Sequence, residues 1–279
     1  MADDEVSAAG TNSVMAMDSR YGLFDWLDRR SAYNQEFFPQ PLLVDDTGLE
    51  KDGELEFGSL HTQANARRSD IVTAEVQKSF GLLTLELSVP YERDSEAGGI
   101  SQGIGNIDLG ARHPIYQFVS AGGFFDTTLG VAMEAGIPAS PAISINPEFD
   151  SKVFNDLKLG EHFSIQSVFG YSTLAGGGDN GGRQTFEYGF DFAHALSHSE
   201  LPLPGVKRFT PMFELVGETG LNQDESGRNS LLGSLGFRLD LKPMGELQPS
   251  LGLGCVFPID NGARAEVHWG IATSLIFEF

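Results

Sequence analysis

Along most of the chain, apolar and polar residues alternate with a period of two. Residues 83–89 read Leu-Thr-Leu-Glu-Leu-Ser-Val, and residues 186–192 read Phe-Glu-Tyr-Gly-Phe-Asp-Phe. Successive side chains of a β-strand point to opposite faces, so this alternation predicts strands with one apolar and one polar face. Because the pattern recurs up to the final residue, we predict an all-β fold for residues 51–279.

Clusters of turn-forming residues divide this region into about twelve strands. The strands are expected near residues 51–62, 69–79, 81–92, 104–116, 122–136, 148–158, 162–174, 183–196, 207–219, 228–241, 246–258 and 264–279. The segment 148–158 alternates least regularly. An even number of antiparallel strands is typical of a bacterial outer-membrane barrel.

The connections between these strands alternate in length. Tight ones are expected near residues 80–81, 160–161 and 243–245, and longer polar ones at 93–103, 137–147, 175–182 and 220–227. Short turns at one end and longer loops at the other are typical of outer-membrane barrels. The connection at 197–206 is an exception, because it is long where a short turn is expected.

The residue types on the two faces favour a closed antiparallel transmembrane β-barrel over a soluble β-sandwich. One face of the predicted strands carries Phe and Leu almost without interruption, whereas the other combines small and charged residues. A soluble sandwich would also show alternation. A polar lumen surrounded by an aromatic-rich outer surface fits the observed division better, and closure removes the unpaired edges that lipid cannot accommodate. We therefore expect outer-membrane lipid to surround the protein.

Residues 1–50 lack this pattern and are predicted to form a mostly irregular N-terminal domain outside the barrel wall. Residues 19–30 are expected to form a short helix of one or two turns, and Pro39 and Pro41 favour extended backbone after it. This domain is a candidate plug for the lumen. The chain begins Met-Ala-Asp-Asp-Glu-Val, without the basic and apolar regions of a signal peptide. We interpret it as a mature form whose export signal has been removed.

The charge of the chain excludes one class of partner. The formal net charge is −21, and nucleic acid binding needs a basic face that neutralises phosphates. No cofactor is expected either, because the glycine-rich residues 175–182 lack the Gly-Lys-Ser/Thr ending of a phosphate-binding loop. No metal site is expected, since His194 and His198 lie four apart in an extended segment, where this spacing does not bring two side chains together.

The polar faces carry more acidic than basic residues. The residues expected to line the lumen are Glu187, Asp191, Glu214, Asp108, Arg112, Arg238, Asp240 and Glu266. They form either a packed interior of Arg–carboxylate pairs or a narrow pore that favours cations. We favour a narrow channel or transporter-like barrel for small solutes. The alternatives are a barrel hydrolase, for which His162 and His268 are the nearest candidates, and a closed barrel that docks a partner.

Two resemblances support this interpretation. Residues 275–279, Leu-Ile-Phe-Glu-Phe, resemble the terminal signature of Gram-negative outer-membrane proteins. This resemblance implies a bacterial outer-membrane location, with Phe279, Phe277 and Leu275 as the signal for the barrel-assembly machinery. Residues 105–112, 214–220 and 231–237, together with 41–44 followed by 53–56, resemble the family of outer-membrane transporters named for the meta-pathway of phenol degradation. That resemblance implies a transport function.

Overall fold

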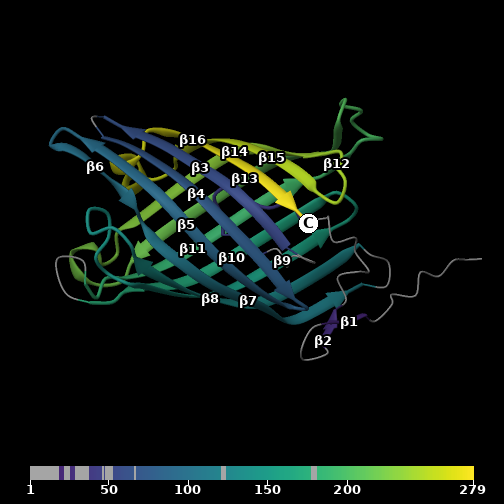
Figure 1. Cartoon of the computed structure of the whole chain (residues 1–279), viewed down its shortest axis with the longest axis horizontal. Coiled ribbons are helices and arrows are strands. Elements are labelled where there is room, and N and C mark those ends of the chain that lie inside the picture. Colours follow the sequence, from purple (N-terminus) through teal and green to yellow (C-terminus); the bar gives the residue numbers. More distant parts are fainter. Residues whose placement is uncertain are drawn as a thin grey trace, which may run out of the picture.

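The computed structural model describes residues 19–21, 26–28, 38–45, 47, 53–65, 67–120, 124–176 and 181–279. In this part of the chain, twelve long strands form one antiparallel barrel with strongly tilted strands (Figure 1). The long strands are β3 (Gly53–Ala64), β4 (Arg67–Phe80), β5 (Leu83–Glu96), β7 (Asn106–Val119), β8 (Phe125–Pro138), β9 (Glu148–Leu159), β10 (Phe163–Leu174), β11 (Gln184–His194), β13 (Val206–Gly220), β14 (Asn229–Leu241), β15 (Gln248–Pro258) and β16 (Trp269–Glu278). Two short strands, β6 (Gly99–Ile104) and β12 (Leu196–Ser197), pair with β5 and β13.

The barrel closes where the last strand meets the first. β16 pairs with β3 from Trp269↔Gln63 to Glu278↔Glu54. Beyond the end of β16, the N–H of Phe279 donates to the carbonyl of Gly53 at 2.9 Å and the N–H of Gly53 donates to the carbonyl of Phe279 at 3.1 Å. Closure pairs the backbone of both edge strands, which a lipid-exposed sheet requires. We call this end of the barrel the terminal end and the opposite end the far end.

The distribution of polarity is inverted relative to a soluble protein. Many large apolar side chains are exposed on the outer face, including Leu109, Met133 and Leu235. The largest fully buried side chains are mostly polar, among them Arg238, Gln166 and Glu214. An apolar outside and a polar inside suit a lipid surrounding and a hydrated lumen. This inversion confirms the predicted barrel and excludes the sandwich.

The connections follow the predicted alternation in length except between β3 and β4, where the far-end connection spans only residues 65–66. Tight turns at the terminal end contain Gly81, Gly160 and Gly245, whose φ angles are +72°, +68° and +70°. Glycine adopts this left-handed region without the steric cost that a Cβ atom imposes. The connection between β11 and β13 is long at the terminal end, as the sequence indicated.

Three local predictions are wrong. The final strand begins at Trp269 rather than at residue 264, because residues 261–266 form the short helix α1 (Asn261–Glu266), whose first turn is capped by Asp260. The predicted loop at 93–103 is largely the paired ends of β5 and β6. Within the segment expected to be helical, the described residues form two short antiparallel strands, β1 (Ser19–Tyr21) and β2 (Trp26–Asp28). One or two isolated helical turns are only marginally stable, so cross-strand pairing competes easily with them.

The Asp260 carboxylate holds α1 at the far end of the barrel. It accepts hydrogen bonds from the N–H groups of Ala263 and Leu231 at 2.8 and 3.1 Å and from the side chain of Asn229 at 2.7 Å. Burial by itself would raise the pKa of Asp260, but these hydrogen bonds outweigh it and the pKa is lowered. In the described part of the chain, no helix is long and apolar enough to cross a membrane.

Candidate functional site: the occupied lumen

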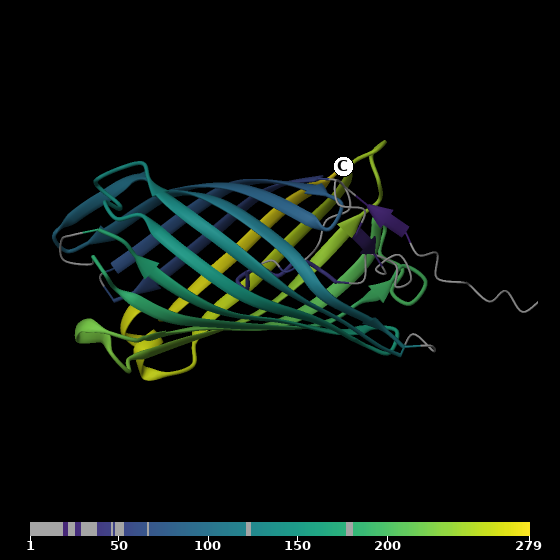
Figure 2. The same ribbon diagram turned by 90° about the horizontal axis from the view of Figure 1, so that it is seen from below.

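Part of the N-terminal domain lies inside the barrel. We call residues 38–45 and 47 the plug segment; Figure 2 shows its dark trace between the walls. Within it, Gln40, Val44 and Thr47 are buried, with exposed fractions of 8%, 6% and 1%. Gln40 bonds Glu54 near the terminal end, Asp45 pairs with Lys152 deeper in the barrel, and Thr47 bonds Asp156 nearer the terminal end again. The segment therefore enters from the terminal end, reaches the middle of the barrel and turns back.

The deepest part of the plug segment is held by a single carboxylate oxygen. Glu214 Oε1 accepts hydrogen bonds from the backbone N–H groups of Leu42, Leu43 and Val44 at 2.7, 2.8 and 3.3 Å. Glu214 is fully buried. Successive N–H groups that converge on one anion form a backbone nest, whose partial charges stabilise the carboxylate. This contact explains how an acidic residue can be buried at the centre of the barrel.

Arg238 holds the carbonyl side of the same segment. Its Nε donates to the carbonyl of Gln40 at 2.7 Å and its Nη2 donates to the carbonyl of Pro41 at 3.0 Å, while Nη1 donates to Ser274 Oγ at 3.3 Å. Only 2% of the Arg238 surface is exposed. The planar guanidinium group presents several donors in a fixed geometry, which suits adjacent carbonyl groups. Glu214 thus binds backbone N–H groups of the plug segment, and Arg238 binds backbone carbonyl groups of the same segment.

Glycines in the barrel wall make room for the apolar side chains of the plug segment. A Cβ atom at Gly252 would lie 2.4 Å from Leu42 Cδ2, and one at Gly189 would lie 2.9 Å from Val44 Cγ1. Both distances are below normal contact, so larger residues there would displace the loop. Val44 also belongs to a small apolar cluster with Phe154 and Val168. The inward glycines of the sequence therefore have a packing role against the plug.

Among the residues that the structure describes, two cavities lie beside the plug segment. One of about 340 Å³ lies between the plug and the wall that β3 to β9 form, and its charged lining residues are Asp45, Glu56, Glu75, Glu86, Arg112, Glu134 and Lys152. The other, of about 280 Å³, extends toward the far end and is lined in part by Glu187, Glu218 and Glu266. Acidic side chains outnumber basic ones in both cavities. The unfilled part of the lumen is therefore negatively charged.

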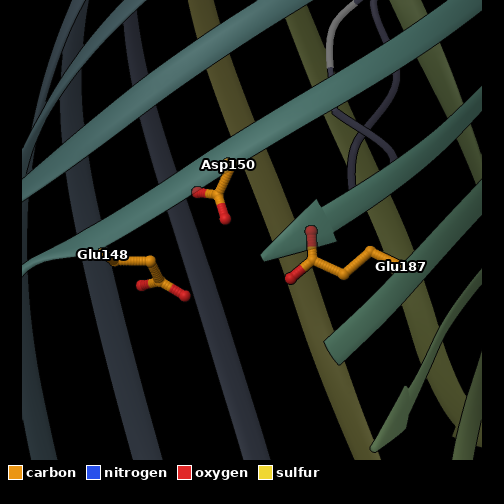
Figure 3. A group of neighbouring side chains, drawn as sticks. All are labelled: Glu148, Asp150 and Glu187. Atoms are coloured by element: carbon orange, nitrogen blue, oxygen red, sulfur yellow. The ribbon is translucent and has the colours of Figure 1, made fainter. Parts of the chain in front are cut away.

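Three carboxylates converge on the far-end side of the plug. Oxygen atoms of Glu148, Asp150 and Glu187 all lie within 4.8 Å of one another (Figure 3). Lys152 is the nearby base, and its Nζ is engaged by Asp45 at 2.9 Å and Glu134 at 3.0 Å. Like charges at this separation repel one another strongly in a confined space. The cluster therefore places three carboxyl groups around one small space in the lumen.

The structure divides the residues expected to line the lumen into two groups. Glu187, Asp108 and Arg112 line cavities, and Arg112 also pairs with Glu86 at 3.2 Å. Four others, Asp191, Glu214, Arg238 and Asp240, are buried, as Arg112 is, but line none of these three cavities. Asp240 is bonded to Arg208 and Ser250 instead of facing open space. The packed interior and the acid-lined open space that a pore would require thus lie in different parts of the lumen.

Two expectations about placement need correction. Glu266 belongs to the helix α1 and not to a strand. It is exposed and borders the far-end cavity. His162 and His268, considered for a hydrolase, lie in connections and not on the lumen-facing side of a strand. Sequence reasoning missed the plug anchors Lys152 and Asp156. Their inward position follows from alternation, but their partners lie more than 100 residues away along the chain and left no local signal.

Replacing Glu214 with Ala should loosen the plug segment. The substitution leaves three N–H groups inside the barrel without their acceptor, and each buried group left unsatisfied costs about 1–3 kcal/mol. In a Val44→Cys/Cys255→Ser background, we expect Glu214→Ala to increase the rate at which a water-soluble maleimide labels position 44 by at least tenfold. Asp240→Asn is the matched control, because Asp240 is buried but contacts Arg208 and Ser250. Equal labelling rates in both variants would show that Glu214 does not retain the plug.

Comparison with known proteins bears on the fold. No protein-family model and no curated protein sequence matches this chain. The crystal structure of the COG4313 outer membrane channel from Pseudomonas putida F1 is similar over 85% of this chain and 100% of that chain, with a TM-score of 0.56 and 17% identity. The NanC porin is similar over 81% of this chain and 98% of its own, with a TM-score of 0.49 and 9% identity. The chain thus has the twelve-stranded barrel fold of an outer-membrane channel.

Proposed function

We propose that this protein is a narrow outer-membrane channel for small solutes, with a plugged and acidic lumen that favours cations. The observation that carries the proposal is the pair of acid-lined cavities beside the plug segment, set in a wall whose outer face is apolar. The resemblance to the transporter family named for the meta-pathway of phenol degradation agrees with a transport role. A bacterial outer-membrane location follows from the same proposal.

The carboxylate cluster is the proposed source of ion preference. Glu148, Asp150 and Glu187 lie on the far-end side of the plug, so a solute that enters from the far end meets them before it reaches residues 42–45. Rings of acidic side chains select cations in narrow pores because counter-ions accumulate at the fixed charges. Asp191 is not part of this surface, since it is fully buried. Selectivity is therefore assigned to Glu187 and Glu148 and not to Asp191.

Neutralising the cluster should reduce cation preference. We expect the double variant Glu148→Gln/Glu187→Gln to lower the cation-to-anion permeability ratio at least twofold, because two of the three converging charges are lost. The ratio is obtained from the reversal potential across a planar bilayer under a salt gradient. Glu246→Gln, an exposed residue in the turn between β14 and β15, is the control for net charge. Wild-type protein without conductance would contradict the channel and favour a closed partner-docking barrel.

A further inference from the structure

We propose that His162, His194 and Glu200 form a binding site for a divalent transition metal, such as zinc, on the rim of the terminal end. The three residues come from separate segments of the chain. His162 lies in the turn between β9 and β10, His194 ends β11, and Glu200 lies in the long connection to β13. This is the connection whose length is exceptional for the terminal end. The site is independent of the plug and of the proposed channel.

The fold places the two histidines side by side. Strand pairing puts His194 opposite Phe163, next to His162, and the N–H of Ala195 donates to the carbonyl of His162 at 2.8 Å. The centres of the two imidazole rings are 5.5 Å apart. Metal–nitrogen distances of 2.0–2.1 Å at a tetrahedral zinc ion separate the centres of two ligated rings by about 5 Å. The backbone therefore already spaces the rings as a shared metal requires.

The hydrogen bond at Nδ1 determines which nitrogen of His162 is available. Nδ1 lies 3.0 Å from the carbonyl oxygen of Ala195, which can only accept, so Nδ1 carries the proton. In the neutral ring, Nε2 then bears the lone pair. A backbone carbonyl at the second nitrogen is the usual arrangement for a histidine that ligates a metal, since it fixes the tautomer and the ring orientation.

The lone pair of His162 faces a carboxylate. Nε2 lies 3.2 Å from Glu200 Oε1 and 4.0 Å from Glu161 Oε2. A lone pair and a carboxylate oxygen repel each other unless a proton or a cation lies between them. Two ligand atoms of a tetrahedral zinc ion are roughly 3.3–3.5 Å apart, close to the observed separation. Because Glu161 is almost fully exposed, it is free to turn toward the metal as a fourth ligand.

The second carboxylate oxygen of Glu200, Oε2, holds the side chain in position. Glu200 Oε2 accepts hydrogen bonds from the N–H of Ser197 at 2.8 Å and from Ser197 Oγ at 2.7 Å, so Oε1 is left facing His162. The hydrogen bonds from the Ser197 hydroxyl and backbone lower the pKa of Glu200. These hydrogen bonds thus hold the carboxylate in the orientation that the site requires.

One movement is needed to complete the site. Among the described residues, only Glu148, Asp150 and Glu187 have their three ligand atoms within 4.8 Å of one another, so a nitrogen of His194 must rotate toward His162 Nε2 and Glu200 Oε1. His194 is exposed, which leaves its ring room to turn. The nearest alternative is a protonated His162 paired with Glu200, in which His194 has no role. The two arrangements differ in their dependence on His194.

Metal titration of the full-length, tag-free protein in detergent tests the site. We expect one Zn²⁺ ion per chain by calorimetry, and Co²⁺ to give the absorption bands of a tetrahedral complex that Zn²⁺ abolishes. His162→Gln, His194→Gln and Glu200→Gln should each weaken Zn²⁺ binding at least tenfold. His268→Gln, which changes an exposed histidine at the far end, should leave binding unchanged. Heat-modifiability on a detergent gel verifies that every variant is a folded barrel.

Two results would overturn the proposal. The first is the absence of saturable Zn²⁺ binding by the wild-type protein. The second is a folded His194→Gln variant that binds Zn²⁺ as tightly as wild type, which would leave only the His162–Glu200 pair. Because neither measurement involves conductance, failure here is separate from failure of the proposed channel.

Discussion

Replacing residues 40–45 with alternating Gly and Ser is expected to increase the single-channel conductance severalfold. The substitution removes the apolar contacts of Leu42 and Val44 with the wall and the Asp45–Lys152 ion pair at 2.9 Å. A Gly-Ser chain of the same length remains flexible in water and has no side chain to fill these positions. The lumen between the two acid-lined cavities would then be continuous. Planar-bilayer recordings in symmetrical salt measure the change directly.

The matched control changes six residues elsewhere in the N-terminal domain. Replacing residues 5–10 with the same Gly-Ser sequence should leave the conductance at the wild-type value. If both replacements raise the conductance equally, the effect does not come from the plug segment. If neither does, the plug segment does not limit the flow of ions.

A reversible cross-link distinguishes a movable plug from a fixed one. A Cβ atom at Gly189 would lie 3.5 Å from Val44 Cβ, which is within the range for a disulfide. The variant Val44→Cys/Gly189→Cys, with Cys255→Ser to remove the native thiol, should lock the plug when oxidised. A conductance that falls on oxidation and returns on reduction would mean that the plug moves during conduction. Equal conductance in both states would mean that ions pass a stationary plug.

The second large effect is expected at the chain terminus, where deletion of Phe279 should reduce the yield of heat-modifiable barrel about tenfold in cells. Phe279 continues the β16–β3 pairing through two backbone hydrogen bonds with Gly53. Its ring also packs close to Gly53, whose added Cβ atom would lie 3.0 Å from Phe279 Cε2. Deletion removes both contacts at the closure and the aromatic residue that the barrel-assembly machinery is proposed to read.

Two substitutions of Phe279 distinguish the loss of barrel closure from the loss of recognition by the barrel-assembly machinery. Phe279→Ser keeps the backbone hydrogen bonds but loses the aromatic ring, whereas Phe279→Tyr keeps both. We expect Phe279→Ser to assemble poorly and Phe279→Tyr to assemble normally on a gel of boiled and unboiled membrane extracts. Phe124→Ser is the control, because Phe124 is 69% exposed in a turn at the same end. A normal yield from Phe279→Ser would contradict the proposed assembly signal.

Agreement between sequence and structure is closest where the information is local. Alternation placed Phe186 on the outer face and Glu187 on the inner face. The predicted start of the last strand was wrong because α1 occupies residues that had been assigned to that strand. The cap of α1 at Asp260 depends on contacts with Asn229 and Leu231, which are distant in the sequence. A six-residue helix held by distant partners has no periodic signal of its own.

The sequence by itself determined the class of fold and the side of the wall on which the residues of regularly alternating segments lie, because strand periodicity and residue polarity are local properties. Only the tertiary structure decided how the charges inside are used. Glu214 and Glu187 are both acidic, inward-facing and strand-borne, yet Glu214 binds three N–H groups of the plug segment and Glu187 borders open space. What separates them is the path of the plug segment, more than 160 positions away from Glu214 along the chain. Contacts at such separations depend on the folded barrel and leave no local pattern in the sequence.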